Sequence, residues 1–595
     1  MKISKALKTL VLLAIVVCSN AIFAQQPSTY QVHSHNDYAQ EFPFWGAYVG
    51  GAASIEADVF LKNNILYVTH SEAEILPENT LERLYLQPLA GLARTGDLRK
   101  LQLLIDIKSD AESTLEALVQ ELQDYPVLTQ SENLKWVISG NRPKASAYKN
   151  YPDFIEFDHQ ELDDLDTIDL SRVGLISVDF KNYSVWNGFG NMVAPELKKV
   201  KEAIAKAQAV DKPFRFWGSP DTKITWTRFA NLSVAYINSD VPAQAVSYLK
   251  TLEQNTYVNT KKVEVYTPEF SFDYEDKPVN VILMIGDGNG LAQITSAQIA
   301  NRGNLTLTQL QDIGFSKTAS TDDLVTDSAA GATAMATGTK THNRAIGVNQ
   351  NDEKLKNITE ILSARGFTNG LITTDAIDGA TPASFYAHRK ERDDTEGILS
   401  DLATSGIDFF IAGGRSKAAL VPDIFKVLQL DDFVDLNGKT AIYIGENKVP
   451  SIAQGRGDLL AQSVKQSLEI LEKDREPFFM MIEASQIDSN GHANNTAGIV
   501  QEMLDFDETI ARVLRFADKT KNTLVVITAD HETSGFGIIS GDLKTGELHG
   551  EFLTTNHTGI MVPVFAYGPQ AQKFRGAYEN TEIFQRILKA LEIVP

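Results

Sequence analysis

Ser328 has the clearest potential for nucleophilic chemistry, because it stands in a small-residue stretch, Thr326-Asp327-Ser328-Ala329-Ala330-Gly331-Ala332. We predict a strand-to-helix junction here, with Thr326 or Asp327 capping the helix. Ser328 would then lie in the first helical turn, where the helix dipole favours a phosphate or an oxyanion. A lone serine at such a position is more often an ordinary helix residue, so the prediction depends on its surroundings.

Carboxylates and histidines border several apolar runs that are typical of buried parallel strands. In open α/β sheets, ligands bind beyond the carboxyl ends of the strands. Asp488 and His492 are four residues apart and can reach one ion, and Ser489-Asn490-Gly491 between them favours a loop over a helix. We therefore expect Ser328 to share one edge of a sheet with Asp287, Asp375, Asp378, Glu483, Asp530, His531 and His557. This pattern predicts a metal-activated nucleophile.

The ligand types suggest which metals would bind. Mixed histidine and aspartate ligands suit Zn²⁺, whereas the oxygen set Asp287, Thr381 and Glu483 suits Mg²⁺. Two zinc ions about 4 Å apart can clamp the attacking and leaving oxygens of a phosphoryl transfer. For Asp287 alone, a turn aspartate that caps the next helix is an equally good interpretation.

These segments, in this order, resemble the alkaline phosphatases from about Val279 to Pro569. The matching stretches are Ile285-Gly286-Asp287-Gly288, Thr326 to Thr339, Ala380-Thr381-Pro382-Ala383, Glu483 to His492, Thr528-Ala529-Asp530-His531-Glu532 and His557-Thr558-Gly559. The resemblance implies one zinc held by Asp488, His492 and His557. It implies a second held by Asp287, Asp530, His531 and, in the free enzyme, Ser328. Magnesium would take Asp287, Thr381 and Glu483.

The resemblance also implies a mechanism. Zinc would activate the Ser328 hydroxyl, a phosphoserine would form, and Arg392 would clamp the phosphoryl oxygens of small-molecule phosphate esters. A homodimer is one assembly that we consider. The chain departs from the family at Gly379, where relatives carry Asp or His in support of magnesium. We hypothesise that Asp378 substitutes for this side chain, or that the magnesium site is weaker.

Charged residues in the N-terminal half form pairs two positions apart on predicted strands, so each pair shares a face. The pairs are His33 and His35, Glu56 and Asp58, and Asp106 and Lys108, and His70 ends a further strand. Charges inside a barrel are costly unless they are paired or bound to metal. The alternative is solvated strand ends with local salt bridges.

The stretches His35-Asn36-Asp37-Tyr38, Ile55-Glu56-Ala57-Asp58-Val59, Val68-Thr69-His70 and Ile105-Asp106-Ile107-Lys108 resemble the phospholipase C-like and glycerophosphodiester phosphodiesterase superfamily. The resemblance covers roughly Tyr30 to Leu252. It implies His35 and His70 as acid and base, and Glu56, Asp58 and Asp106 around one Ca²⁺ or Mg²⁺. The Arg-Gly that follows the first histidine in glycerophosphodiesterases is Asn36-Asp37 here, which leaves the substrate open.

The order of elements predicts an α/β protein with two domains. We expect a signal peptide at 1–24, a (β/α)₈ TIM-like barrel at 30–252, a linker at 253–276 with one strand at Val263–Tyr266, and a phosphatase domain at 277–595. The last is expected to be an α/β/α sandwich around a mostly parallel sheet.

Composition narrows the functional classes. The net charge of −22 makes nucleic-acid binding through phosphate contacts a poor prediction. Lys2, Lys5 and Lys8 before the apolar run Leu10–Val17 predict a secretory signal, and hence export to the periplasm or outside the cell. Cys18, the one cysteine, lies in this signal; a lipoprotein is the lesser alternative. No later run is long and apolar enough to span a membrane.

Three rival functions remain open on the sequence alone. The phosphatase half could instead be a related phosphodiesterase, sulfatase or phosphomutase that uses the same ligands. The barrel could be a non-catalytic module that binds a ligand such as a lipid headgroup or a glycan. A non-catalytic zinc-binding protein would predict that Ser328→Ala changes nothing.

Overall fold

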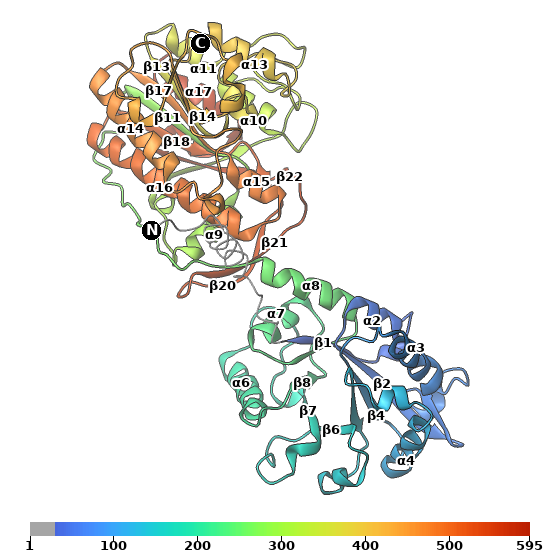
Figure 1. Cartoon of the computed structure of the whole chain (residues 1–595). Helices are drawn as coiled ribbons and strands as arrows, with labels where there is room; N and C mark the ends of the chain where they lie inside the picture. The colour runs from blue at the N-terminus through green and yellow to red at the C-terminus, as the bar shows by residue number, and fades with distance from the viewer. Residues whose placement is uncertain (1–29, 595) are drawn as a thin grey trace, which may run out of the picture. The chain divides into compact units, whose positions relative to one another are not determined.

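The computed structural model describes residues 30–594, and these divide into two compact units between Glu253 and Gln254 (Figure 1). The predicted signal peptide lies outside the described residues. Each unit has its own hydrophobic core, so we describe each by itself.

The N-terminal unit is a closed barrel of eight parallel strands. Their order around the barrel is β1-β9-β8-β7-β6-β5-β4-β2, and pairing between β1 and β2 closes it. The strands are β1 (Gln31–Ser34), β2 (Ser54–Lys62), β4 (Leu101–Ile107), β5 (Leu134–Gly140), β6 (Ile155–His159), β7 (Val173–Asp179), β8 (Phe214–Trp217) and β9 (Tyr236–Ser239).

The strand that we predicted to end at His70 is not part of the barrel wall. Residues Ile65–Val68 form β3, which pairs antiparallel with the end of β2 as a hairpin. The turn residues Asn63 and Asn64 both have positive φ, which two-residue hairpin turns require. The hairpin carries His70 back along β2 to Asp58, in the middle of that strand.

Successive side chains along each strand point alternately into the barrel and toward the apolar layer between the strands and the helices. On β2, Ile55, Ala57 and Val59 belong to the outer apolar cluster, so Glu56 and Asp58 point inward. A small inner cluster, Leu104, Val137 and Leu175, fills the barrel below them. The covering helices are α2 (Trp45–Gly50), α3 (Gln87–Thr95), α4 (Ala111–Leu122), α5 (Pro126–Thr129), α6 (Ala194–Ala209), α7 (Lys223–Asn231) and α8 (Pro242–Gln254).

The segment that we predicted as a linker packs against the C-terminal unit. Residues Thr256–Val258 form β10, which pairs with β21 (Glu547–Glu551), whereas the predicted strand Val263–Tyr266 is irregular. Its aromatic side chains explain this packing: the Tyr266 hydroxyl donates to Asp518, and the Phe270 N–H donates to the Tyr567 hydroxyl.

The C-terminal unit is built on a ten-stranded sheet in the order β15-β16-β14-β13-β17-β11-β18-β23-β12-β24. Every neighbouring pair is parallel except those that β23 makes, so β23 alone runs the other way. The strands are β11 (Asn280–Gly286), β12 (Asp312–Lys317), β13 (Thr368–Ala376), β14 (Phe409–Gly413), β15 (Lys426–Leu428), β16 (Thr440–Tyr443), β17 (Phe478–Ala484), β18 (Thr523–Thr528), β23 (Val562–Tyr567) and β24 (Gly576–Glu579).

Helices cover both faces of this sheet, as the predicted sandwich requires. Along β11, Val281, Leu283 and Ile285 belong to one core cluster, and Ile282 and Met284 belong to the other. The first face carries α10 (Ser328–Thr337), α11 (Ile358–Ser363), α12 (Ala380–Ala383), α13 (Thr395–Asp401) and α17 (Thr581–Ala590). The second carries α9 (Leu291–Ala300), α14 (Leu459–Asp474) and α16 (Thr496–Thr520).

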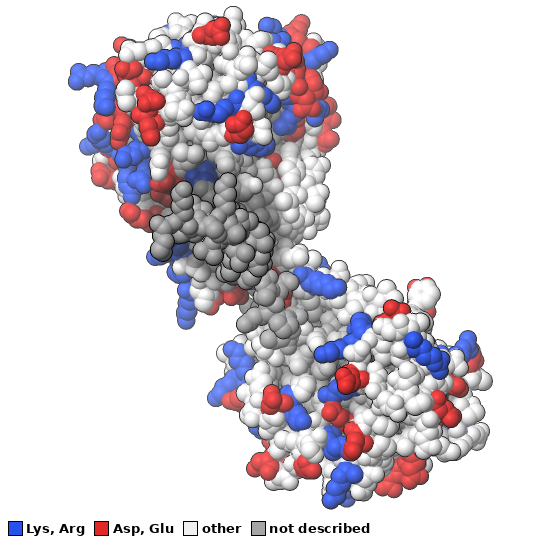
Figure 2. Space-filling model, in the orientation of Figure 1, with Lys and Arg blue, Asp and Glu red and all other residues white. Residues whose placement is uncertain are grey.

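Acidic and basic side chains are interspersed on the viewed surface of both units (Figure 2). The negative net charge is therefore spread out on this face and is not gathered into one patch. Across residues 30–594, none of the helices combines the length and the apolar composition that a membrane span needs.

Candidate functional site

Ser328 is the first residue of α10 and is almost fully buried. The Asp327 carboxylate caps the helix by accepting from the Ala330 N–H at 3.0 Å, as one of the two predicted caps. The prediction of a strand-to-helix junction is wrong in one respect, because residues 318–327 separate β12 from α10. The Ser328 Oγ lies 3.2 Å from the His531 Nε2.

His557 reaches Ser328 and His531 through an antiparallel connection. The two-residue strand β22 (His557–Thr558) pairs with β19 (Glu532–Thr533), and β23 then leaves this edge of the sheet in the opposite direction to its neighbours. The rings of His531 and His557 stack with centroids 3.6 Å apart. The sequence order, with His557 before its apolar run, follows from this reversed strand.

Asp488 and His492 lie on a helix, α15 (Gln486–His492), so the loop that we favoured between them is wrong. The helix spacing brings the His492 Nε2 within 3.3 Å of the Asp488 carboxylate and within 3.1 Å of the His557 Nε2. Only a residue without a Cβ fits at position 491 of this helix, because a Cβ there would lie 2.8 Å from the Thr533 side chain. Asp488, His531 and His557 form one group of atoms that could hold a metal ion.

Asp287, Asp530 and His531 form a second group of converging ligand atoms. The His531 Nε2 lies 3.5 Å from Asp287 and 3.2 Å from Asp530. One oxygen of each carboxylate is buried without a hydrogen-bond partner, and buried oxygens of this kind are costly unless a cation takes them. The donor set therefore fits a zinc ion.

The electrostatics of these groups also suit metal binding. Burial lowers the pKa of His531 and of His557 to about 4, so both rings are neutral and free to ligate at neutral pH. Burial and the Asp488 charge raise the pKa of Asp530 to about 6. Burial opposes ionisation of Asp488 as well, but the His492 hydrogen bond and the nearby histidines lower its pKa. Crowded carboxylates of this kind gain most from a cation.

The predicted magnesium residues lie at the ends of neighbouring elements. Glu483 is the penultimate residue of β17 and pairs with Ile285 near the end of β11, two residues before Asp287. Thr381 lies in α12, which packs against β17. The Thr381 Oγ1 is buried without a hydrogen-bond partner. Burial and the charge of Asp375 raise the pKa of Glu483 to about 8. Oxygen donors in this arrangement fit a hard cation such as Mg²⁺.

One carboxylate oxygen of Asp378 is engaged, whereas its Oδ1 is buried without a hydrogen-bond partner. Its Oδ2 accepts from the Lys417 Nζ at 2.6 Å and from the Thr395 hydroxyl at 3.0 Å. The structure instead places the carboxylate of Asp375 beside Gly379. Asp375 is therefore a second candidate for the role that we hypothesised for Asp378.

Arg392 extends over the N-terminus of α10, where it donates to the Asp327 carboxylate at 3.0 Å. Its side chain is partly exposed and also borders a cavity of about 310 Å³ that Asp375, Gly379 and Lys448 help to line. The helix cap thus orients a guanidinium next to Ser328.

The barrel interior brings Glu56, Asp58 and Asp106 together as a third group that could hold a metal ion. Asp58 and Asp106 face each other on neighbouring strands, and each has a buried oxygen without a partner. Lys108 bridges them from 3.2 and 3.0 Å. Burial and the Glu56 charge raise the pKa of Asp106 to about 6. These oxygens fit Ca²⁺ or Mg²⁺.

The two barrel histidines reach this group from different sides. The His70 Nδ1 lies 2.8 Å from Asp58, with most of the ring exposed. The His35 Nδ1 lies 2.7 Å from Asp240, and its Nε2 lies 3.9 Å from Glu56. Both imidazoles thus have a carboxylate partner and an accessible edge, as general acids and bases need.

Arg215 is a buried part of this site that the sequence reasoning missed. Its guanidinium donates to Glu56 at 2.9 Å and contacts His33, whose Nε2 is 2.8 Å from the same carboxylate. Burial and the Arg215 charge lower the pKa of His33 to about 3, so its ring is neutral. The available signal was an arginine between aromatic residues in Phe214-Arg215-Phe216-Trp217, because a charge on a buried strand needs a partner.

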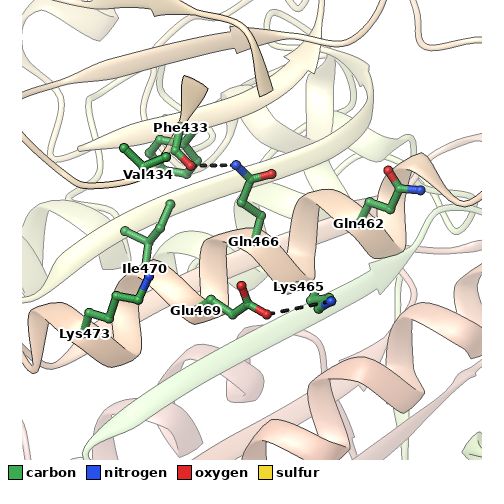
Figure 3. A pocket seen from close by; sticks show the side chains of 8 residues that line it. All are labelled: Phe433, Val434, Gln462, Lys465, Gln466, Glu469, Ile470 and Lys473. Atoms are coloured by element: carbon green, nitrogen blue, oxygen red, sulfur yellow. Dashed lines mark hydrogen bonds and ion pairs between the residues drawn. The ribbon is translucent and has the colours of Figure 1, made fainter. Parts of the chain in front are cut away.

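A further surface depression, of about 340 Å³, lies over α14 (Figure 3). Its contacts are structural: Gln466 donates to the Phe433 carbonyl at 2.6 Å, and Lys465 pairs with Glu469 at 3.9 Å. None of the residues that line it is a predicted site residue.

Known proteins resemble the C-terminal unit over most of its length. A model of the family described as alkaline phosphatase matches residues 278–409, 450–549 and 546–593. Alkaline phosphatase 3 of Bacillus subtilis is 30% identical over 416 residues, which cover 53% of this chain and 90% of the relative. The Escherichia coli alkaline phosphatase is 30% identical over 409 residues, covering 53% and 87%.

A solved structure also resembles the C-terminal unit, and a family model matches part of the N-terminal unit. The alkaline phosphatase from the Antarctic bacterium TAB5 is 38% identical with a TM-score of 0.51, covering 54% of this chain and 100% of that one. An AIM6-like phosphodiesterase domain matches residues 22–96, which include His35, Glu56, Asp58 and His70. The chain belongs to the alkaline phosphatase family and carries a phosphodiesterase-like barrel ahead of its phosphatase unit.

Proposed function

We propose that the C-terminal unit hydrolyses phosphate monoesters of small molecules through a phosphoserine at Ser328. The observation that carries this proposal is the position of the Ser328 Oγ at the N-terminus of α10, 3.2 Å from the His531 Nε2 and beside two groups of metal-ligand atoms. A helix N-terminus stabilises the negative charge that builds up on a phosphoryl group.

The chain's own residues would divide the work of the reaction. Ser328 attacks phosphorus and becomes phosphorylated, and water then releases phosphate from the serine. Arg392 holds two equatorial phosphoryl oxygens with its planar fork, as the Asp327 contact orients it. The leaving oxygen departs opposite Ser328, toward Asp488, His492 and His557.

Three metal ions would complete this site. Asp488, His492 and His557 would hold one zinc; Asp287, Asp530, His531 and, in the free enzyme, Ser328 would hold another; Asp287, Thr381 and Glu483 would hold magnesium. When bound, such ions lower the pKa of hydroxyl groups and offset the charge of transferred phosphoryl groups. We also propose export to the periplasm or the cell exterior, on the basis of the sequence signal at residues 1–24.

For the barrel we propose phosphodiester hydrolysis, with His35 and His70 as acid and base. Glu56, Asp58 and Asp106 would hold one Ca²⁺ or Mg²⁺. The match to a phosphodiesterase domain and the buried carboxylate oxygens without partners support this proposal. The monoester product of the barrel is the kind of substrate that the second unit accepts, so the two reactions could run in sequence.

A substrate panel with the full chain tests the phosphatase proposal. We expect p-nitrophenyl phosphate to be hydrolysed far faster than bis-p-nitrophenyl phosphate or p-nitrophenyl sulfate, because Ser328 and Arg392 suit a dianionic monoester. A chelator should abolish the activity, and zinc with magnesium should restore it. Preference for the sulfate or the diester, with dependence on Ser328, would instead favour another member of the superfold.

Replacing Arg392 by alanine should lower kcat/KM for monoesters by roughly 10- to 100-fold, since a charge-assisted hydrogen bond is worth about 1.5–3 kcal/mol. The loss should be smaller for Arg392→Lys, which keeps the charge but not the fork. Inhibition by inorganic phosphate should weaken in parallel. An unchanged inhibition constant would remove Arg392 from phosphate binding. Arg389→Ala is the control, because Arg389 pairs with Asp401 away from Ser328.

A further inference from the structure

We propose that Asp375 supplies the carboxylate of the third metal site in place of the side chain missing at Gly379, with Lys448 as its partner. This inference rests on the proposed magnesium site and extends it to two residues that the family pattern does not assign. Lys448 lies in the segment 410–449, which separates two stretches matched by the family model.

Gly379 is not required by its backbone conformation. Its φ of −60° and ψ of 153° are accessible to any residue, so the absence of a side chain needs another cause. A Cβ built at position 379 would lie 2.8 Å from the Asp375 Oδ2 and 2.9 Å from its Cγ. The carboxylate of Asp375 therefore occupies the space that a side chain at 379 would enter.

Asp375 is tied to Glu483 through one threonine. The Thr373 hydroxyl donates to the Glu483 carboxylate and accepts from the Asp375 N–H at 2.8 Å. Asp375 follows Thr373 on β13, and Thr373 lies opposite Glu483 in the parallel pair.

Lys448 lines the same cavity as Asp375. Its Nζ lies 3.4 Å from the Asp375 Oδ2. An ammonium at this point orients the Asp375 carboxylate and lessens its repulsion from nearby acidic groups.

A buried oxygen without a partner points to a ligand at this place. The Thr381 Oγ1 makes no hydrogen bond, although Thr381 is more than nine-tenths buried. Thr381 lies two residues beyond Gly379 in α12, which packs on β13 and β17. Asp375, Gly379 and Ala380 line the adjoining cavity, which gives a hydrated ion a route in. A magnesium ion commonly keeps several waters, so Asp375 can act directly or through one of them.

The experiment compares Asp375→Asn with Asp378→Asn in the full chain and measures bound magnesium and zinc by elemental analysis. Asp378 is the matched control, because it is also a carboxylate paired with a lysine and lines the same cavity. We expect Asp375→Asn to lower the magnesium affinity at least about 10-fold with zinc unchanged, and Asp378→Asn to retain both metals. Equal magnesium binding by wild type and Asp375→Asn overturns the proposal.

A reciprocal exchange keeps the test independent of a folding defect. Gly379→Asp alone should lower the melting temperature, because its Cβ meets the Asp375 carboxylate. Adding Asp375→Ser should relieve the crowding and restore magnesium binding, with the carboxylate now at position 379. Failure of the double variant to bind magnesium, with zinc and stability intact, also overturns the proposal. Absence of magnesium from the wild type, with zinc bound and monoesterase activity present, removes the third site and leaves the proposed phosphatase standing.

Discussion

Replacing Ser328 by alanine should lower monoester hydrolysis by roughly 1,000-fold or more, because the reaction loses its nucleophile. Some activity over the uncatalysed rate should remain, since Arg392 and the metal ligands still bind the phosphoryl group. The measurement is kcat with p-nitrophenyl phosphate, together with acid quenching of the wild type and mass spectrometry of the peptide that contains Ser328. We expect phosphate on Ser328 in the wild type and none in the variant.

Ser384→Ala is the control for this experiment. The Ser384 hydroxyl is buried, donates to the Ala380 carbonyl at 2.9 Å and lies 3.4 Å from the Ala329 carbonyl, so its loss perturbs the surroundings of α10 without touching the Ser328 Oγ. We expect a loss of about 1 kcal/mol in the free energy of unfolding and near-normal turnover. If Ser328→Ala keeps wild-type turnover and zinc content, the phosphoserine mechanism is wrong. The chain would then be a zinc-binding protein or would use another nucleophile.

Much of the phosphatase site could be predicted because its ligands follow recognisable local patterns. Asp287, Glu483 and Asp530 each directly follow or end an apolar run, and parallel strands deliver such residues to one edge. His557 does not fit this pattern, because it precedes the apolar run Val562–Tyr567. Only the pairing of β22 with β19 and the reversal of β23 explain why it meets His531. Pairing of this kind depends on contacts between distant segments, which a local pattern does not encode.

The errors in local structure also have physical causes. Helix propensity is weak in the segment Ser489-Asn490-Gly491, but α15 continues through this segment, where Gly491 packs closely against Thr533. The segment after Gln254 lacks a helical period, yet its aromatic residues pack into the C-terminal core. In both cases tertiary contacts override the local preference.

The fold class of the barrel could be predicted from its βα rhythm, but the role of β3 could not. Strand spacing alone does not show whether a strand joins the barrel wall or folds back as a hairpin. Arg215 was missed because its partners Glu56 and His33 are more than 150 residues away in sequence. The sequence shows that Gly379 departs from the family pattern, but only the structure shows that Asp375 fills the space beside it.

Replacing Glu56 by glutamine should lower the release of inorganic phosphate from a small phosphodiester by about 100-fold or more, because the barrel loses a charged metal ligand. The substitution keeps the size of the side chain, which His33 and Arg215 both contact at one carboxylate oxygen. Hydrolysis of a monoester by the same variant should stay at the wild-type rate. The measurement is phosphate released from each substrate by the full chain, with and without added Ca²⁺ or Mg²⁺.

Comparison with two other variants separates sequential action from its rivals. Glu156→Gln removes a half-exposed barrel carboxylate that pairs with Lys135, and it should release phosphate at the wild-type rate. Ser328→Ala should cleave the diester but accumulate the monoester, since the second reaction is blocked. Undiminished phosphate release by Glu56→Gln would disprove the coupling. If no monoester accumulates with Ser328→Ala while the barrel still binds the diester, the barrel is a ligand-binding module. The inward-facing Glu56, Asp58 and Asp106 then stabilise a bound ligand and do no chemistry.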